Sequence, residues 1–429
     1  MRKTDYLIIG GSAAGTTAAE VIRGIDPKGA ITIISEEPHE QYSRVLIPHY
    51  LRHKVSREQV FLKKPEWYGE KKIELVKGVR AKSLEPSRKE VVTSDGETYQ
   101  YKKLLIAVGG RVVPFNAPGA DLENVLYMRT IENADDIIAA ASQAKRGVII
   151  GGGFIGLEFS SSFKSNGVED VTILVREPYF WQGKLDESSS RVLVGVLTRN
   201  GIKVLTGEEV DRFDPARNVI LGSEATPESD SGRARMTVGS VVTKSGKSFE
   251  AQVVGIGVGI KPDLDWLKNS GIEVNRGILT NEYLETTIPD VYAAGDCAEF
   301  ADVVFGRQHI VGNWANATSQ GNAVGKNMAA TLLRQGSEGQ GKTVFETASS
   351  YSINFFDGSC SFIGVTDSEF ADEIVTRGSV GGGKMTQIYV KTIDGVMRIV
   401  GATVINNPGE VAPLSAAIKG KIDIFRNKA

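Results

Sequence analysis

One sequence pattern occurs twice in the chain, at residues 4–36 and again at residues 147–176. Each copy has an apolar run, a glycine-rich turn, an amphipathic stretch and a second apolar run, in that order. This order is typical of a strand–helix–strand unit whose glycine turn brings a pyrophosphate to the N-terminus of the helix. Two such units in one chain predict two dinucleotide sites, one for a tightly held cofactor and one for an exchangeable partner.

The first turn reads GGSAAG over residues 10–15, and Ser12 stands where the pattern usually has its middle glycine. A serine is small enough to admit a phosphate, so we expect the turn to bind it through Gly10, Ser12, Ala13, Ala14 and Gly15. The second apolar run ends at Glu36 and Glu37, whose carboxylates are placed to accept hydrogen bonds from ribose hydroxyls. Solvated acidic residues without a ligand are the alternative.

The second turn, GGGFIG at residues 151–156, fits the G-x-G-x-x-G pattern without exception. It follows an apolar strand and opens a helical pattern, as the motif requires. We therefore expect the second nucleotide to be bound by Gly151, Gly153, Phe154, Ile155 and Gly156.

The strand after the second turn ends at Val175, and Arg176 comes next. NAD sites typically have an acidic side chain there for the ribose 2′-hydroxyl, whereas an arginine pairs with a 2′-phosphate. The sequence therefore predicts NADPH over NADH. NADH stays open because Glu177 follows directly and because Gly156, the third glycine, is typical of NAD sites. A surface arginine without a ligand is a further alternative.

Composition excludes several classes of partner. The net charge is −2 and 41% of the residues are apolar, so we expect no nucleic-acid or anionic membrane partner. No apolar run approaches the roughly 20 residues of a membrane span, and the chain enters a strand almost at once, so we expect a cytoplasmic protein without a signal peptide. Cys297 and Cys360 stand alone in the sequence, which predicts neither a disulfide framework nor a metal site.

Two later segments add to the fold prediction. In TTIPDVYAAGD at residues 286–296, we expect a strand that delivers Gly295 and Asp296 to the start of a helix near the cofactor. Residues 385–390 and 397–405 alternate in polarity and are separated by Asp394 and Gly395, which predicts an antiparallel hairpin.

Taken in order, these motifs resemble those of the two-dinucleotide flavoprotein reductases, the pyridine-nucleotide–disulfide oxidoreductase superfamily. The resemblance covers essentially the whole chain. GGSAAG is similar to the FAD pyrophosphate turn, and LLIAVGG at residues 104–110 is similar to the second FAD segment. GGGFIG is similar to the nicotinamide-nucleotide turn, and TTIPDVYAAGD to the segment whose aspartate, here Asp296, holds the FAD ribityl chain. The resemblance implies FAD and NADPH, or NADH, as cofactors.

The implied fold class is α/β, with two Rossmann-like (glutathione-reductase-type) dinucleotide-binding domains and a small α+β C-terminal domain. In this family the nicotinamide domain splits the FAD domain. We therefore predict an FAD domain from residues 1–115 and 263–335, an NAD(P)H domain from residues 116–262, and a C-terminal domain from residues 336–429.

Residues 36–62 contain no cysteine, although disulfide reductases of the superfamily have their redox cysteines shortly after the first unit. The stretch EEPHEQYSRVLIPHYL instead resembles ferredoxin and rubredoxin reductases, apoptosis-inducing factor and the flavin module of NAD(P)H nitrite reductases. In that comparison Arg44 falls on an arginine that contacts FAD. His49 falls on a position where many members have a lysine beside the flavin N5. The histidine in place of this lysine is a departure from the family pattern.

Further roles follow from the same comparison. Glu158 matches a glutamate that reaches the flavin–nicotinamide junction, and we expect it to form a catalytic polar pair with His49. Phe154 matches a position that gates the nicotinamide ring, and Trp314 one that covers the pyrimidine end of the flavin. The alternatives are that His49 is an ordinary loop histidine, that Phe154 serves only helix–sheet packing, and that Trp314 is a core tryptophan. The remaining cofactor contacts that the resemblance implies are Ala81, Gly109, Arg111 and Gly257.

The implied function is an FAD-dependent NAD(P)H oxidoreductase. It would pass a hydride from NAD(P)H to FAD, and electrons on to a small ferredoxin- or rubredoxin-like protein or another non-disulfide acceptor. An oxidase that uses O₂, and a slowly turning nucleotide-sensing flavoprotein of the apoptosis-inducing-factor type, are the alternatives. The sequence does not identify the acceptor, and a homodimer stays open.

Overall fold

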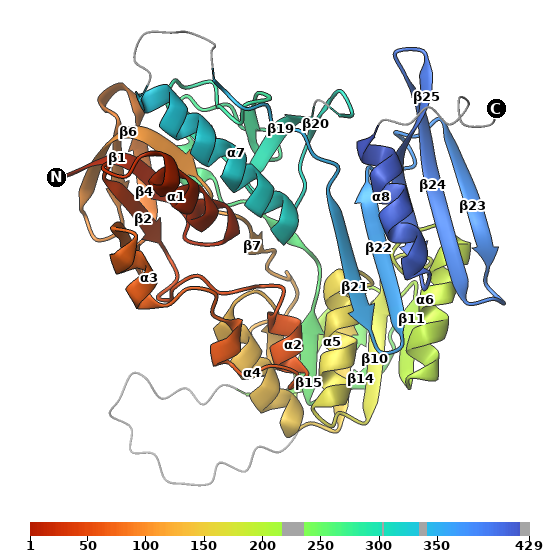
Figure 1. The fold of residues 1–429 in the computed structure, drawn as a ribbon. Coiled ribbons are helices and arrows are strands. Elements are labelled where there is room, and N and C mark those ends of the chain that lie inside the picture. Colours follow the sequence, from red (N-terminus) through yellow and green to blue (C-terminus); the bar gives the residue numbers. More distant parts are fainter. Residues whose placement is uncertain (217–235, 303, 334–340, 421–429) are drawn as a thin grey trace, which may run out of the picture. The chain divides into compact units, whose positions relative to one another are not determined.

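The computed structural model describes residues 1–216, 236–302, 304–333 and 341–420 (Figure 1). The chain divides into two compact units. Unit 1 consists of Met1–Val45, Arg57–Arg111 and Ile260–Tyr351, and unit 2 of Leu46–Ser56, Val112–Gly259 and Ser352–Ala429. The three-domain division expected from the sequence stays a prediction. Among the described helices, none combines the length and the apolar character that a membrane crossing needs.

Unit 1 is built on a seven-stranded sheet in which β3-β2-β1-β6-β5-β4 are neighbours in that order and β18 also pairs with β6. The strands are β1 (Arg2–Ile9), β2 (Ile31–Ser35), β3 (Ile73–Lys77), β4 (Ala81–Glu85), β5 (Glu90–Thr93), β6 (Thr98–Ile106) and β18 (Val291–Ala293). In β1, Tyr6 and Ile8 belong to one buried cluster and Leu7 and Ile9 to another. A parallel strand covered on both faces has to be apolar throughout, which explains the continuous apolar run.

Helices α1 (Ala13–Ile25) and α7 (Trp314–Leu333) pack together closely in unit 1. A Cβ on Gly321 would lie 2.3 Å from the Ala14 carbonyl oxygen, and one on Gly325 would lie 2.8 Å from the Ala18 carbonyl oxygen. Only glycine therefore fits at these two positions of α7. The shorter elements of unit 1 are η1 (Glu58–Val60), α3 (Pro65–Glu70), η2 (Pro86–Arg88) and η3 (Asp265–Leu267).

The predicted helix after Asp296 is wrong. The chain continues directly into β19 (Ala298–Asp302), which pairs in parallel with β17 (Ile278–Thr280) and antiparallel with β20 (Arg307–His309). The backbone N–H and C=O groups of β19 are hydrogen-bonded to these two strands, and this pairing favours a strand over a helix here. The helix that follows in the chain, α7, begins only at Trp314.

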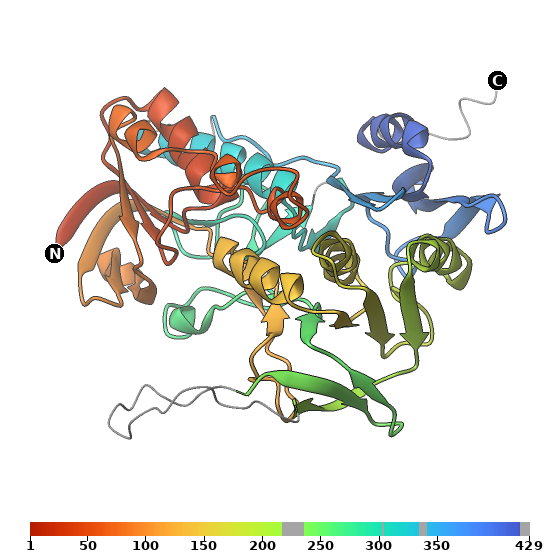
Figure 2. The same ribbon diagram turned by 90° about the horizontal axis from the view of Figure 1, so that it is seen from below.

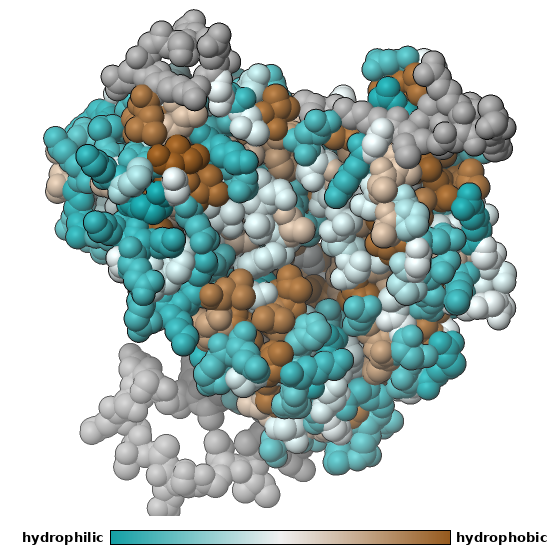
Figure 3. All heavy atoms as spheres, viewed as in Figure 1, coloured by the Kyte–Doolittle hydropathy of each residue, from teal (hydrophilic) through white to brown (hydrophobic). Residues whose placement is uncertain are grey.

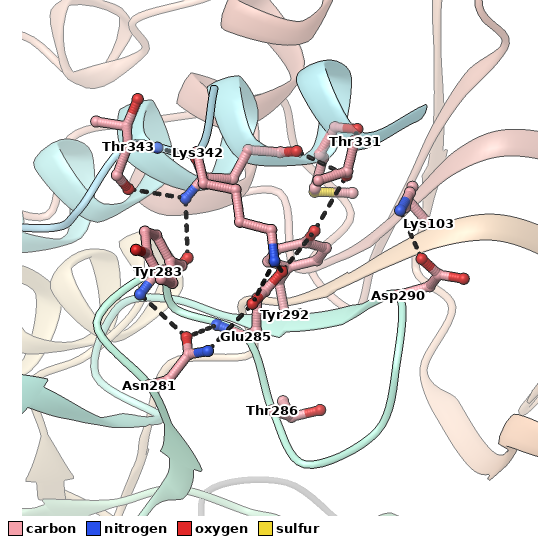
Figure 4. A network of polar contacts seen from close by, with 12 residues as sticks. Lys103, Asn281, Tyr283, Glu285, Thr286, Asp290, Tyr292, Thr331, Lys342 and Thr343 are labelled. Carbon is pink, nitrogen blue, oxygen red and sulfur yellow. Dashed lines mark hydrogen bonds and ion pairs between the residues drawn. The ribbon is translucent and has the colours of Figure 1, made fainter. Parts of the chain in front are cut away.

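A polar network fastens the end of α7 to the loop before β18 (Figure 4). The carboxylate of Glu285 is paired with Lys342 and accepts a hydrogen bond of 3.3 Å from the Tyr292 hydroxyl. That hydroxyl also lies 3.2 Å from Oγ1 of Thr331 on α7. Asn327, one turn earlier on α7, donates to the carbonyl oxygen of Tyr283. The network thus ties three separate segments of unit 1 to one helix.

Unit 2 contains a parallel five-stranded sheet with the order β11-β10-β9-β15-β8. Its strands are β8 (Val125–Tyr127), β9 (Arg146–Ile150), β10 (Asp170–Val175), β11 (Ile202–Thr206) and β15 (Val253–Ile256). Figure 2 shows helices on one side of this sheet and an antiparallel three-stranded sheet on the other. The helices are α4 (Ile131–Ser142), α5 (Phe154–Ser165) and α6 (Glu187–Arg199), and the three strands are β12 (Val210–Pro215), β13 (Val238–Thr243) and β14 (Ser248–Glu250).

The short helix α2 (Ile47–Leu51) also belongs to unit 2 and packs against α4 and α5. On the face drawn in Figure 3, hydrophobic side chains gather over α2 and α4. Two two-residue strands, β7 (Arg111–Val112) and β16 (Ile260–Lys261), occur where the chain passes between the units.

The C-terminal part forms a five-stranded sheet with the order β21-β22-β25-β24-β23. Its elements are β21 (Ser350–Phe355), β22 (Gly358–Gly364), β23 (Glu373–Ser379), β24 (Lys384–Ile393), β25 (Val396–Ile405), η4 (Pro408–Glu410) and α8 (Val411–Lys419). The predicted hairpin is confirmed as β24 and β25, with Asp394 at φ +52° and Gly395 at φ +74° in the turn. Two consecutive positive φ angles match the twist of a tight hairpin. The predicted fold class is confirmed.

Candidate functional site

The first glycine turn of unit 1 leaves no room for side chains. Gly10 has φ +116°, and a Cβ there would lie 2.1 Å from the Ala107 carbonyl oxygen. A Cβ on Gly15 would lie 1.9 Å from the carbonyl oxygen of Gly10. Ser12 is the N-cap of α1 but makes no side-chain cap, so its hydroxyl does not occupy the first N–H groups of the helix. Those groups, on Ala13 and its neighbours, fit a pyrophosphate.

The acidic residues after β2 are held by arginines. Glu36 is ion-paired with Arg111 and is half-exposed, whereas Glu37 is paired with Arg44. Burial alone would lower the pKa of Arg44, but the negative charges of Glu37 and Asp296 raise it. Asp296 therefore lies close enough to Arg44 to act on its charge. The structure brings these predicted FAD residues into one part of unit 1.

A buried amide lies beside the same region. Gln320 on α7 is fully buried, and its Oε1 accepts a hydrogen bond of 2.6 Å from the backbone N–H of Gly295. Its Nε2 has no partner among the described residues, which is unusual for a buried polar atom. Together with the glycine cradle, this unused donor fits a bound FAD.

The remaining predicted FAD residues are placed as follows. Gly109 follows β6 with φ +66°, and Trp314 begins α7, half-buried against the cluster that contains Tyr6 and Ile8. Ala81 begins β4 and is buried in the opposite cluster, with Leu7 and Ile9.

The second glycine turn, in unit 2, repeats the cradle. Gly151 has φ +107°, and a Cβ there would lie 2.4 Å from the carbonyl oxygen of Gly257. A Cβ on Gly156 would lie 2.2 Å from the carbonyl oxygen of Gly151, and Gly257 in turn lies against Ile155. Gly153 is the N-cap of α5. The turn fits a nucleotide pyrophosphate, and close packing alone requires a glycine at position 156.

Glu158 on α5 is paired with Arg52, the C-cap residue of α2. Nη1 of Arg52 donates to Oε2 of Glu158 at 2.8 Å and to Oγ of Ser161 at 3.2 Å. The Glu158 side chain is 15% exposed and that of Arg52 only 8%. Burial raises the pKa of Glu158 to about 7, although the guanidinium opposes the shift. Within the described residues, Arg52 bonds Oε2 and Oε1 of Glu158 accepts no hydrogen bond.

The expected pairing of Glu158 with His49 is not found. No hydrogen bond joins these two side chains in the described part of the chain, and Arg52 takes the place of the expected partner. Burial, together with the positive charges of Arg52 and Lys54, lowers the pKa of His49. The neutral form of His49 is therefore favoured. Sequence reasoning missed Arg52, because the family comparison points to His49, which lies one helical turn earlier.

Two further predicted residues belong to unit 2: Phe154 lies in an aromatic cluster, and Arg176 lies at the surface. Phe154, the first residue of α5, packs edge-on against Trp181 with ring centroids 4.7 Å apart. Phe362 of β22 completes the cluster, 5.7 Å from Phe154 and 5.1 Å from Trp181. Arg176 is 71% exposed and lies 2.8 Å from the carboxylate of Glu177.

The comparisons with known proteins agree with this arrangement. Residues 4–321 match the family described as pyridine nucleotide-disulphide oxidoreductase. The chain belongs to this family. Its members are NAD(P)H-dependent FAD oxidoreductases.

Relatives and solved structures support the assignment. The chain is 31% identical to the nitrite reductase [NAD(P)H] of Bacillus subtilis (strain 168), over 71% of this chain and 36% of that protein. It is 31% identical to monodehydroascorbate reductase 2 of Arabidopsis thaliana, over 69% of this chain and 68% of that protein. The chain thus spans about a third of the nitrite reductase.

Among solved structures, NADH:rubredoxin oxidoreductase from Clostridium acetobutylicum is 25% identical, with a TM-score of 0.74 over 98% of this chain and 96% of that chain. The putidaredoxin reductase–putidaredoxin complex has a TM-score of 0.85 at 23% identity, over 100% of this chain and 95% of that chain. That second likeness shows the fold alone.

The thiols of this family member are not placed for disulfide chemistry. Cys297 and Cys360 are both free and fully buried. Burial raises the pKa of Cys297 to about 11, and it also raises the pKa of Cys360. The reactive form of a cysteine is the thiolate, so neither residue is activated at neutral pH.

Proposed function

We propose that the protein is an FAD-dependent NAD(P)H reductase that delivers electrons to a small redox protein or another acceptor that is not a disulfide. The observation that carries the proposal is the pair of glycine cradles, each closed to side chains and each opening onto a helix N-terminus. FAD, when bound, takes up the hydride of NAD(P)H and hands on its electrons. The chain supplies binding, orientation and charge.

The proposed roles divide between the two units. In unit 1, the turn at residues 10–15 would hold the FAD pyrophosphate, Glu36 the adenosine ribose and Asp296 the ribityl chain. In unit 2, the turn at residues 151–156 would hold the nucleotide pyrophosphate. Oε1 of Glu158 would accept a hydrogen bond from the nicotinamide end, while Arg52 fixes the orientation of the carboxylate.

The absence of an activated thiol supports a non-disulfide acceptor, since Cys297 and Cys360 are buried with raised pKa values. The rubredoxin oxidoreductase relative favours a small electron-transfer protein as partner. An oxidase that passes the electrons to O₂ is the second candidate; an engineered water-forming NADPH oxidase shares the fold, with a TM-score of 0.80 at 21% identity, and that likeness shows the fold alone. A nucleotide-sensing flavoprotein with slow turnover is a third. A cytoplasmic location and a homodimer also remain proposals.

An acceptor panel tests this function. Protein reduced anaerobically with NADPH should reoxidise rapidly with ferricyanide, quinone dyes or a small iron–sulfur protein, measured by stopped-flow flavin absorbance. Glutathione disulfide and coenzyme A disulfide should be inert, and Cys297→Ser and Cys360→Ser should change no rate. Rapid reoxidation by O₂ alone would establish the oxidase. A reduced complex that persists with every acceptor would favour the sensor.

We further propose that NADPH is preferred over NADH, because Arg176 follows the strand end and already engages Glu177, the nearest acidic competitor for a ribose hydroxyl. Arg176→Ala should lower kcat/KM for NADPH by about ten- to a hundredfold and leave NADH nearly unchanged, since a charged hydrogen bond is worth about 1.5–3 kcal/mol. Steady-state kinetics with both nucleotides measures the ratio.

Arg191→Ala is the matched control for Arg176→Ala. Arg191 is also exposed, at 65%, and also paired with a neighbouring glutamate, Glu187, at 2.6 Å. Its replacement should leave both nucleotides unaffected. A wild type that prefers NADH, or a ratio that Arg176→Ala does not change, would refute the preference.

A further inference from the structure

Trp181 lies against the second glycine turn. Its indole nitrogen Nε1 would be 3.8 Å from a Cβ built on Gly153, the residue that caps α5. Its ring also packs edge-on against Phe154, the first residue of α5. Trp181 therefore packs against Phe154 and lies beside Gly153 at the start of α5, although it follows β10 and is distant from both residues in sequence.

The local backbone holds Trp181 in this place. Trp181 has φ +62°, a conformation that L side chains rarely adopt. Its carbonyl oxygen accepts hydrogen bonds of 3.1 Å from the backbone N–H groups of Lys184 and Leu185. The preceding Phe180 is fully buried, with its ring 3.1 Å from a Cβ built on Gly152. Consecutive aromatic side chains thus lie against consecutive glycines of the turn.

The indole N–H of Trp181 is unused. Within the described residues it donates to no protein group, and the side chain is only partly buried, so the N–H is open to solvent or to a ligand. The apolar part of the ring, in contrast, is packed between Phe154 and Phe362. Tryptophan commonly combines a packed ring with a polar edge that meets a ligand or water. Here the polar edge lies at the helix N-terminus, which is where a dinucleotide pyrophosphate binds.

We propose that Trp181 is a nucleotide-binding residue whose indole N–H donates a hydrogen bond to the pyrophosphate of bound NAD(P)H. The inference rests on the proposed function, because it takes the second glycine turn as the NAD(P)H site. Trp181 adds a side-chain donor to the backbone N–H groups of the turn. Phe154 and Phe362 hold the ring in position for that contact.

The test measures equilibrium binding, without turnover. NADP⁺ and NAD⁺ are titrated by calorimetry into the FAD-loaded, oxidised protein. Trp181→Phe keeps a ring against Phe154 but removes the N–H, so its Kd for both nucleotides should rise about tenfold, as expected for the loss of one hydrogen bond to a charged group. Trp181→Ala also removes the ring and should bind at least as weakly.

A second probe isolates the pyrophosphate. Adenosine 2′-monophosphate has no pyrophosphate, so wild type and Trp181→Phe should bind it equally. Trp266→Phe is the matched control, because it makes the same change in unit 1 and should leave every Kd unchanged. FAD content and the thermal unfolding midpoint of each variant show that the fold is intact.

Other outcomes overturn the inference. An unchanged Kd in Trp181→Phe would show that the N–H does not contact the nucleotide. Tighter binding by Trp181→Ala would show that the ring blocks the site. Equal weakening of adenosine 2′-monophosphate would place the contact away from the pyrophosphate. A wild type that binds neither NADP⁺ nor NAD⁺ would instead refute the proposed function, which distinguishes the two failures.

Discussion

Gly15→Ala should yield a protein that retains little or no FAD, although the change adds only one methyl group. That methyl would lie 1.9 Å from the carbonyl oxygen of Gly10, which is backbone and cannot rotate away. The turn and the start of α1 would have to separate, displacing the N–H groups expected to hold the pyrophosphate. Overpacking of this kind costs about 1–3 kcal/mol in stability. Flavin absorbance per protein and the thermal midpoint measure both effects.

Gly24→Ala is the control for Gly15→Ala. Gly24 lies on the same helix, and a Cβ there meets nothing within 4 Å. This variant should keep its FAD and gain about 0.5–1 kcal/mol, because alanine favours the helical state over glycine. If Gly15→Ala bound FAD as tightly as Gly24→Ala does, the first turn would not be the FAD site.

Glu158→Gln should change the pH dependence of stability more than any surface substitution. Burial raises the pKa of Glu158 from 4.5 to about 7. Between pH 4.5 and pH 7 the folded protein therefore keeps this carboxyl group protonated, whereas the unfolded chain has already lost the proton. Wild type therefore loses stability as the pH rises from about 4.5 to 7, and the loss stays constant above that. A shift of this size corresponds to about 3 kcal/mol at most. Glutamine does not titrate and avoids the loss.

The difference in thermal midpoint between Glu158→Gln and wild type should thus grow between about pH 5 and pH 7 and then level off up to pH 8. Glu169→Gln is the control. Glu169 is exposed, and the hydrogen bond and charge of Lys145 lower its pKa. The difference in thermal midpoint between Glu169→Gln and wild type should therefore not change over this pH range. A flat difference for Glu158→Gln as well would show that Arg52 keeps the carboxylate ionised throughout. Stopped-flow flavin reduction by NADPH should also slow in Glu158→Gln if this carboxylate orients the nicotinamide.

Features with local determinants could be predicted from the sequence. The glycine turns and the hairpin at Asp394 and Gly395 depend on residues next to one another, and the family resemblance that implied the fold class rests on the order of such motifs. The helix expected after Asp296 failed because β19 is decided by pairing with β17 and β20, which are separate in sequence. Tertiary pairing overrode a local interpretation.

The site was predicted less completely for the same reason. Arg52 and Glu158 meet because α2 packs against α5, and no spacing in the sequence shows that contact. Family comparison named His49, whose position on α2 is one turn away from Arg52. Trp181 carries no motif at all, and only the folded loop after β10 places it at Gly153.

The interleaving of the two units bears on how the chain is made. β6 receives its partner β18, and α1 its partner α7, only from the segment Ile260–Tyr351, long after the first turn has left the ribosome. Until then the nascent first sheet has an unpaired edge and an uncovered helix face, both of which invite association with other chains. Unit 2 is completed later still, by Ser352 onward. A chain that is truncated before β18 therefore lacks segments that both compact units need.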